Sequence, residues 1–131
     1  MDARQQAVRT TLLKTANQPF VYGKLDCCLF VAKCAEEITG VNYAARFNHT
    51  NAVGALAYIN DAGGLENLVT DLIGAPVEDL ATLQDGDPVL IQLPVVGDEI
   101  LAIFANGQVI AKQESGVIKL PAKTILKGWN L

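Results

Sequence analysis

The chain has 131 residues, of which 50% are apolar and 18% are charged, and its formal net charge is −4. That length suits a single domain with one sizeable core, which we expect to span residues 1–131. The acidic balance and the scattered lysines leave no basic stripe for a phosphate backbone, which argues against nucleic acid as a partner. No apolar run reaches the length of a membrane span, and the polar start Met1–Gln6 does not resemble a secretory signal.

The three cysteines form one cluster rather than a disulfide framework. Cys27 and Cys28 are neighbours, and Cys34 would follow about two helical turns later, on the order of 10 Å away. Cysteines at this spacing can neither pair easily nor close a zinc site. We therefore expect free thiols, no metal and no cofactor, with Cys28 and Cys34 packed in the core or close to the site.

The first part of the chain is predicted to be helical. Asp2–Asn17 carries Ala7, Val8, Leu12 and Leu13 at helical spacing, and Gln18-Pro19 ends the pattern. A central, buried helix is expected to begin after Asp26, which has the position of an N-cap, and to end at Gly40. Its predicted buried face consists of Cys27, Phe30, Val31, Cys34 and Ile38.

Two further helices are predicted before the chain changes character. Thr50 can cap a third helix that runs to about Asp61, and Leu65–Leu72 predicts a short fourth one. The expected apolar faces are Val53, Leu56, Ala57 and Ile59 in the third helix, and Leu65, Leu68 and Leu72 in the fourth.

The last part of the chain reads as β-strands. Apolar runs with β-branched residues are separated by turn signals, of which Asn106-Gly107 is the strongest because both residues tolerate positive φ. The predicted strands are Pro88–Leu93, Ile100–Phe104, Gln108–Lys112 and Val117–Leu120. This order implies an α+β fold in which the central helix packs on a C-terminal antiparallel sheet. Trp129 is expected to anchor the terminal tail on the domain or on a neighbouring subunit.

The segment Phe20–Cys28 carries the chemistry. A turn containing Gly23 is followed by Cys27 in the first turn of the central helix, where unpaired N–H groups and the helix dipole stabilise a thiolate and can hold an oxyanion. Cys27 is therefore the candidate nucleophile for acyl transfer. Asp26 is expected to cap the helix, and Tyr22 either orients the turn or lines a substrate cleft.

This segment resembles the nucleophile site of the NlpC/P60 cysteine peptidases. Members of that family carry a Tyr and Gly turn and then Asp-Cys at the start of their central helix, as Tyr22, Gly23, Asp26 and Cys27 do here. The segment Leu83–Ile91 is similar to the Leu-x-x-Gly-Asp-Leu-Val-Phe-Phe stretch that begins the family's sheet. The resemblance implies a papain-like α+β fold over most of the chain.

A closer likeness is to short proteins encoded in phage tail gene clusters. In these proteins a Cys-Cys pair opens the helix and a Gly-Gly pair follows the third helix, as in Phe20–Gly23, Asp26–Leu29 and Gly63–Leu65. The likeness implies a tail-tip or baseplate protein of the virion, assembled in the host cytoplasm, with other tail proteins as partners.

One position departs from the family's chemistry. The family's next strand begins with the histidine that acts as general base, and Ile100 stands there in this chain. The single histidine, His49, precedes the third helix, so it either pairs with Cys27 or is a surface or cap-region residue. The Asp98-Glu99 pair beside Ile100 is expected to form a turn.

Two functions are therefore open. Ile100 favours a structural or assembly component of a phage tail in which an NlpC/P60-like domain has lost catalysis. The alternative is a peptidase that cleaves cell-wall peptide crosslinks of peptidoglycan during genome entry. In that case Cys27 attacks the amide, and Asp26, Tyr22 and His49 are the remaining candidate catalytic residues.

Overall fold

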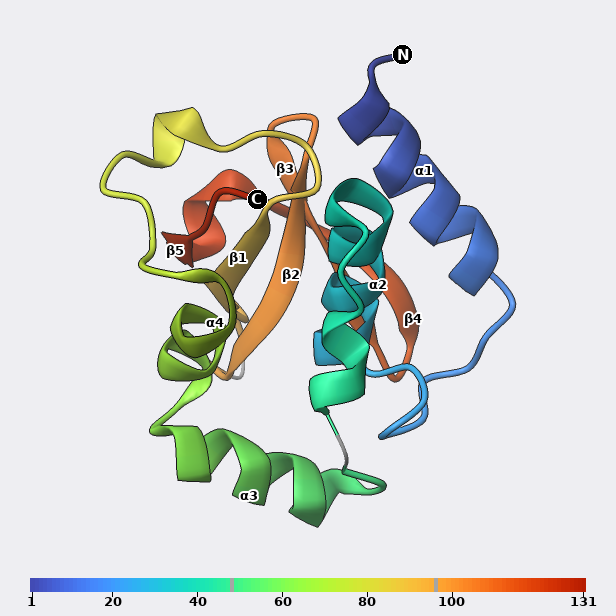
Figure 1. Ribbon diagram of the computed structural model, residues 1–131, viewed down its shortest axis with the longest axis vertical. Helices are drawn as coiled ribbons and strands as arrows, with labels where there is room; N and C mark the ends of the chain where they lie inside the picture. The colour runs from blue at the N-terminus through green and yellow to red at the C-terminus, as the bar shows by residue number, and fades with distance from the viewer. Residues whose placement is uncertain (48, 96) are drawn as a thin grey trace.

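The computed structural model describes residues 1–47, 49–95 and 97–131, and it has the predicted α+β architecture (Figure 1). The described helices are α1 (Ala3–Thr15), α2 (Cys27–Thr39), α3 (Ala52–Ala62) and α4 (Leu65–Ile73), with short 3₁₀ turns η1 (Tyr43–Arg46), η2 (Leu80–Thr82) and η3 (Ala122–Thr124). The described strands are β1 (Pro88–Gln92), β2 (Glu99–Ala105), β3 (Gln108–Gln113), β4 (Gly116–Pro121) and β5 (Ile125–Gly128). Among residues 1–47, 49–95 and 97–131, no helix is long and apolar enough to cross a membrane.

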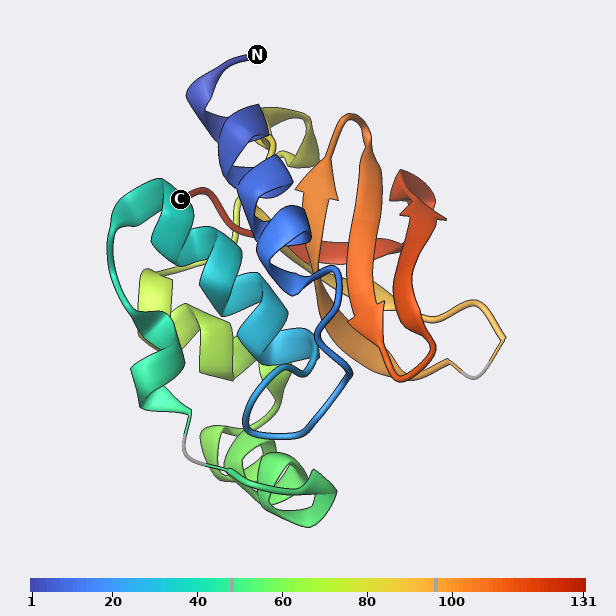
Figure 2. The ribbon, with the colours of Figure 1, turned by 90° about the vertical axis from the view of Figure 1, so that its right-hand side faces the viewer.

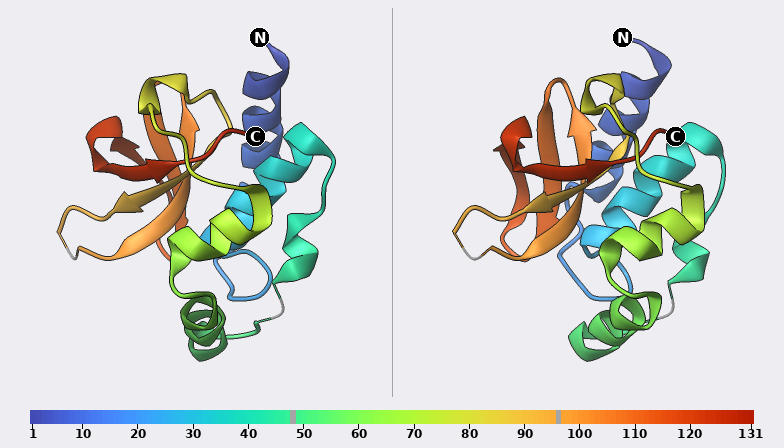
Figure 3. Two further views of the ribbon diagram at one scale, coloured as in Figure 1. Left: turned by 60° about the vertical axis from the view of Figure 1, so that its left-hand side comes forward. Right: turned by 90° about the vertical axis from the view of Figure 1, so that its left-hand side faces the viewer.

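The strands form one antiparallel sheet in the order β4-β3-β2-β1-β5. The predicted turn between β2 and β3 is confirmed, with Asn106 at φ 50° and Gly107 at φ 73°. The edge strand β5, which pairs with β1 across a shift in register, was not predicted. Its four residues are too few to show an alternating pattern, so only the tertiary pairing makes them a strand (Figure 3).

Helix α2 packs beside α1 and against the sheet, and it contacts α1, η1, β2 and β3 (Figure 2). The predicted caps are confirmed, because the Asp26 carboxylate accepts from the Leu29 N–H and Gly40 ends the helix in the left-handed region. Phe30 and Cys34 are fully buried. The central helix is therefore the most deeply packed of the helices, as its sequence indicated.

The three inner strands are apolar because both faces of the sheet are covered. Leu90, Leu101 and Ile103 belong to the cluster around α2, whereas Val89 and Ile91 belong to a second cluster on the opposite face. Strands buried on both faces read as continuous apolar runs rather than as alternating ones. This burial explains why the strands were recognisable without a period of two.

Two predicted apolar faces are confirmed only in part: Ala7 and Val8 are buried on α1 and Ile59 of α3 packs against the core, but other members are exposed. On α1, Leu13 is 66% exposed, and Thr11 and Thr15 are buried instead, each donating its hydroxyl to the carbonyl four residues earlier. On α3 no residue is buried, and Val53 and Leu56 are 79% and 59% exposed. A hydroxyl bonded to its own helix can be buried without a further partner, which apolar spacing alone does not reveal.

The start of α3 also differs from its prediction. The N-cap is Asn51, whose side chain accepts from the Gly54 N–H, and not Thr50. Helix α3 extends from the end of the molecule and packs mainly against α4 (Figure 1).

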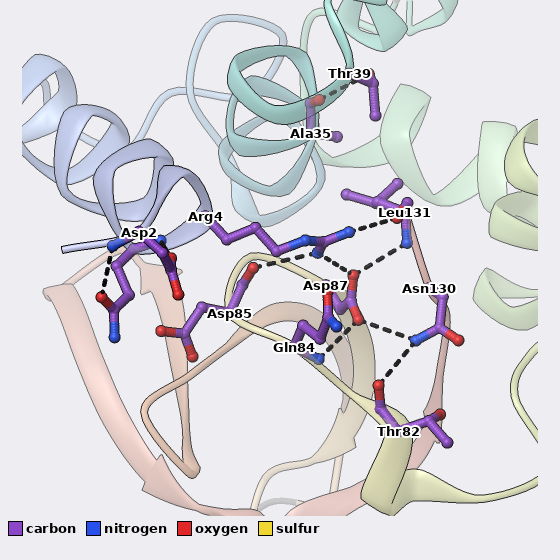
Figure 4. Close-up of polar contacts among 11 residues, drawn as sticks. Asp2, Arg4, Ala35, Thr39, Thr82, Gln84, Asp85, Asp87, Asn130 and Leu131 are labelled. Atoms are coloured by element: carbon purple, nitrogen blue, oxygen red, sulfur yellow. Dashed lines mark hydrogen bonds and ion pairs between the residues drawn. The ribbon is translucent and has the colours of Figure 1, made fainter.

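A fully buried carboxylate joins the two ends of the chain (Figure 4). Asp87 accepts from Arg4 Nη1 at 2.7 Å and from the Leu131 N–H at 3.0 Å, and Arg4 also donates to the Leu131 carbonyl. The Gln84 N–H and the Asn130 side chain complete the coordination of the same carboxylate. Each lone pair of Asp87 that faces the interior therefore has a donor.

Trp129 lies in the core of the domain, 1% exposed, and its indole N–H donates to the Thr70 hydroxyl at 3.4 Å. Trp129 therefore anchors the terminal tail on its own domain, which is one of the two predicted roles.

Replacing Asp87 with asparagine should destabilise the fold strongly. The change keeps the side chain's volume but leaves the Arg4 guanidinium without its counter-charge, so we expect the free energy of unfolding to fall by about 3 kcal/mol. Chemical denaturation measures this loss. Lys14→Gln, which breaks the exposed Lys14–Glu37 pair, is the control and should leave the midpoint unchanged. Equal midpoints for both variants would show that the buried carboxylate does not hold the ends of the chain together.

Candidate functional site

The turn that precedes α2 is folded around the Asp26 carboxylate. Val21 and Leu25 form an isolated antiparallel bridge that closes the turn, and Gly23 occupies it at φ 84°. The Gly23 N–H donates to Asp26 Oδ2 at 3.1 Å, while the Leu29 N–H donates to Oδ1 at 2.9 Å. One buried side chain thus fixes both the turn and the first turn of the helix.

His49 makes the third contact to that carboxylate. Its Nε2 lies 2.5 Å from Asp26 Oδ2, and the two side chains are only 4% and 3% exposed. Both Asp26 oxygens already accept N–H groups, so the imidazole donates from Nε2. The lone pair of the neutral ring is then on Nδ1, which is buried and has no hydrogen-bond partner among the described residues.

The Gly23 turn and the His49 segment are in backbone contact. A Cβ on Gly23 would lie 2.2 Å from the His49 carbonyl oxygen, closer than any side chain allows. The glycine is therefore required twice, for its positive φ and for this close approach. The Asp26–His49 pair depends on the absence of a side chain at position 23.

The thiol of Cys27 is partly exposed, and its pKa lies below the ordinary value of a thiol. The Cys28 thiol, which donates to the Cys27 sulfur, lowers the pKa of Cys27, and the backbone N–H groups of Leu101 and Cys28 act in the same direction. Burial and the Asp26 charge oppose this lowering of the pKa without cancelling it. The contact with Leu101 is possible because β2 faces the start of α2.

The other two thiols are suppressed. The bond to Cys27 and burial raise the pKa of Cys28 well above its ordinary value, and burial raises the pKa of Cys34 to about 11. The prediction that Cys34 packs in the core is confirmed, since it is fully buried. Cys28 is buried too, directly beneath the candidate nucleophile.

Cys27 opens onto a hollow of about 400 Å³ between the Asp26 turn, α3 and the start of β2. The predicted site residues Tyr22, Asp26, Cys27 and His49 all line it. Ile100 lines it as well and contributes an aliphatic side chain. Asp98 and Glu99 form the rim beside Ile100.

The structure brings together residues that the sequence left apart. His49 is held in the site by its contact with Asp26, which lies 23 residues earlier in the chain. The hydrogen bond from the Leu101 N–H to the Cys27 sulfur was not predicted. The contact between His49 and Asp26 had one signal in the sequence, because His49 is the single histidine and Asp26 a carboxylate next to the candidate nucleophile. Within the described residues, no group of three or more histidine, cysteine or acidic side chains is arranged to hold a metal ion.

The whole chain, residues 1–131, matches the protein family described as a domain of unknown function, DUF6950. The chain belongs to this family. No curated protein matches it. We therefore infer the chemistry of this DUF6950 chain from the geometry of the Cys27 hollow.

The thiol chemistry of the DUF6950 chain gives a first test of this geometry. Iodoacetamide at neutral pH should alkylate Cys27 ahead of the other cysteines. Cys28→Ala removes the donated hydrogen bond and should raise the pKa of Cys27, slowing alkylation at pH 7 about fivefold, the equivalent of one hydrogen bond. Mass spectrometry across a pH series gives the site and the inflection. Cys34→Ala should leave the inflection unchanged, and an unchanged inflection in Cys28→Ala would contradict the assigned donor.

The close approach at Gly23 gives a second test. Gly23→Ala and Gly40→Ala both place a side chain in the left-handed region, at φ 84° and 77°, at a cost of about 1 kcal/mol each. Only Gly23→Ala also meets a neighbouring backbone, whereas nothing lies within 4 Å of the Cβ position at Gly40. Denaturation should show the larger loss for Gly23→Ala, together with a change in the His49 ring signals by NMR. Equal losses and unchanged ring signals would rule out the interlock.

Proposed function

We propose that this protein is a thiol-dependent amide hydrolase of the NlpC/P60 kind that acts as part of a phage tail. The observation that carries the proposal is the hollow that Cys27 shares with His49, which is held by Asp26. A cysteine whose pKa is lowered, a histidine with an unpartnered ring nitrogen and a buried carboxylate are the three groups that acyl transfer needs.

Each group has a role in the reaction. The Cys27 thiolate attacks the amide carbonyl, and the backbone N–H of Cys27, which begins α2, is the donor left for the oxygen on which charge develops. His49, charged by the thiol proton at Nδ1, returns that proton to the leaving amine. Water then hydrolyses the thioester, with Nδ1 accepting its proton. Asp26 holds the ring through Nε2 and stabilises its charged form.

The free site is not aligned for the proton transfer. The structure gives no hydrogen bond between His49 and the Cys27 sulfur, both of which are described residues. Catalytic hydrogen bonds often shorten only in the substrate complex, so substrate binding in the hollow would have to bring the two groups together. His49 replaces, from the segment before α3, a base that related enzymes place at the position of Ile100.

The tail setting is supported by sequence alone. The likeness to short proteins of phage tail gene clusters in Phe20–Gly23, Asp26–Leu29 and Gly63–Leu65 suggests peptidoglycan peptides as the substrate and other tail or baseplate proteins as partners. An amide bond between amino acids of a crosslink is a target that this thiol chemistry can reach.

A structural role is the second candidate, and Ile100 favours it. The aliphatic side chain of Ile100 lines the hollow where a base would be expected. His49, the single histidine of the chain, is not hydrogen-bonded to the Cys27 thiol. In this case the domain serves only the assembly of the tail. Cys27→Ala phage would then assemble and infect as the wild type does.

Hydrolysis of isolated muropeptides separates the two candidates. Purified protein should cleave crosslinked peptidoglycan peptides, and Cys27→Ala or His49→Gln should lower kcat/KM by at least about 10³-fold, as removal of a nucleophile or base does. Chromatography of the peptides measures the rate. Cys34→Ala, with its folding verified, is the control and should retain activity. Intact peptides after incubation with folded wild-type protein, together with normal infectivity of Cys27→Ala phage, would favour the structural role.

A further inference from the structure

A second hollow lies on the other side of Cys27. It has a volume of about 420 Å³ and extends toward Phe20 and the turn between β3 and β4, where Glu114 lines it. Tyr22, Cys27, Asp98 and Ile100 line both hollows. The two hollows therefore adjoin at Cys27, and we call them together the Cys27 groove.

The Cys27 groove carries unneutralised negative charge. Asp98 and Glu99 border its first hollow, and Asp98 and Glu114 border the second. None of the described residues that line either hollow is a lysine or an arginine. The ion pairs of the described residues join Arg4 to Asp87, Lys14 to Glu37 and His49 to Asp26. The carboxylates of Asp98, Glu99 and Glu114 therefore have no cationic partner among the described residues.

Two neutral features complete the groove. On one side α3 presents an apolar wall, in which Leu56 is 59% exposed. At the junction, partial burial and the Glu114 carboxylate raise the pKa of Tyr22, which keeps its phenol a hydrogen-bond donor. The groove thus offers apolar surface and a donor near the sulfur, with acidic groups along its border.

His49 supplies a second indication that a ligand belongs here. Its side chain is 4% exposed and lines the first hollow, yet its Nδ1 has no partner among the described residues. Buried polar atoms are nearly always satisfied in folded proteins, so an unsatisfied one on a side chain that lines a hollow points to a ligand atom as its missing partner.

We propose that the Cys27 groove selects amide substrates that carry a free ammonium group, which binds beside Asp98, Glu99 and Glu114. The proposal rests on the proposed function for the identity of the reacting bond and names the substrate class of that site. An amine-bearing peptide fits because its ammonium meets the carboxylates while an aliphatic side chain lies on α3. An anionic substrate of the same size would meet three like charges.

The size of the selection follows from the exposure of the carboxylates. A partly exposed charge pair changes affinity by a few-fold, so three acting together should give a preference on the order of tenfold. Because the charges face solvent, the preference should fall as the ionic strength rises and the Debye length shortens.

Charged thiol reagents test the groove without requiring hydrolysis. The trimethylammonium-ethyl and sulfonatoethyl methanethiosulfonates each transfer a thioalkyl group to the Cys27 thiolate and release methanesulfinate, and they differ in charge. The ratio of their second-order rate constants at Cys27, divided by the same ratio for glutathione methyl ester, should favour the cation by on the order of tenfold. Mass spectrometry confirms that Cys27 is the residue modified.

Charge-removing variants locate the effect. Asp98→Asn, Glu99→Gln and Glu114→Gln combined should lower the normalised ratio to about one. Asp61→Asn, Asp71→Asn and Glu78→Gln change the net charge equally at exposed positions outside the groove and should leave the ratio near the wild-type value. A wild-type ratio near one, or a ratio that the groove variant does not change, would overturn the proposal.

Amide substrates give the matching second readout. Peptide amides with a free amine should show a higher kcat/KM than their acetylated forms, and the groove variant should remove that difference. If no amide is cleaved but the reagent ratio favours the cation, the groove assignment holds and the hydrolase proposal fails. If amides are cleaved with no preference for the amine and the reagent ratio is near one, the hydrolase proposal holds and the groove assignment fails.

Discussion

The Asp26 carboxylate is the contact on which the candidate site depends. It is buried and accepts from three segments: the Gly23 turn, the start of α2 and the linker that carries His49. A carboxylate with this many donors can be buried without a large penalty, because each donor replaces a lost water. Its charge also opposes ionisation of Cys27, and the Cys28 thiol and the backbone N–H groups offset that opposition.

A second buried aspartate lies in a turn that packs against the other end of α2. Asp87 follows Gly86, and a Cβ at Gly86 would lie 2.3 Å from Ile38 Cδ1, near the end of the helix. The Gly86 turn therefore packs against the C-terminal part of α2, while the Asp26 turn holds its N-terminus. The rest of the helix is buried by α1 and the sheet, so the position of Cys27 is fixed by contacts along the whole length of α2.

The features that could be predicted are those that neighbouring residues determine. The sequence predicted the two caps of α2, Asp26 and Gly40, and the Asn106-Gly107 turn, because capping and positive φ are local requirements. The contact between His49 and Asp26 was not, because it is made through a folded linker and has no sequence period. Helix α3 misled for the opposite reason, since its apolar residues follow helical spacing, but only Ile59 of the predicted face packs against the core while Val53 and Leu56 are exposed.

The perturbed thiols tie the chemistry of the site to the stability of the fold. The folded chain releases the Cys27 proton at a lower pH than the unfolded chain does, so ionisation of Cys27 stabilises the fold as the pH rises toward the ordinary pKa of a thiol. Above that value the sign reverses, because Cys28 and Cys34 remain protonated in the folded state while they ionise in the unfolded chain. The contribution of the three cysteines of one helix to stability thus rises and then falls with pH, and it turns near the ordinary pKa of a thiol.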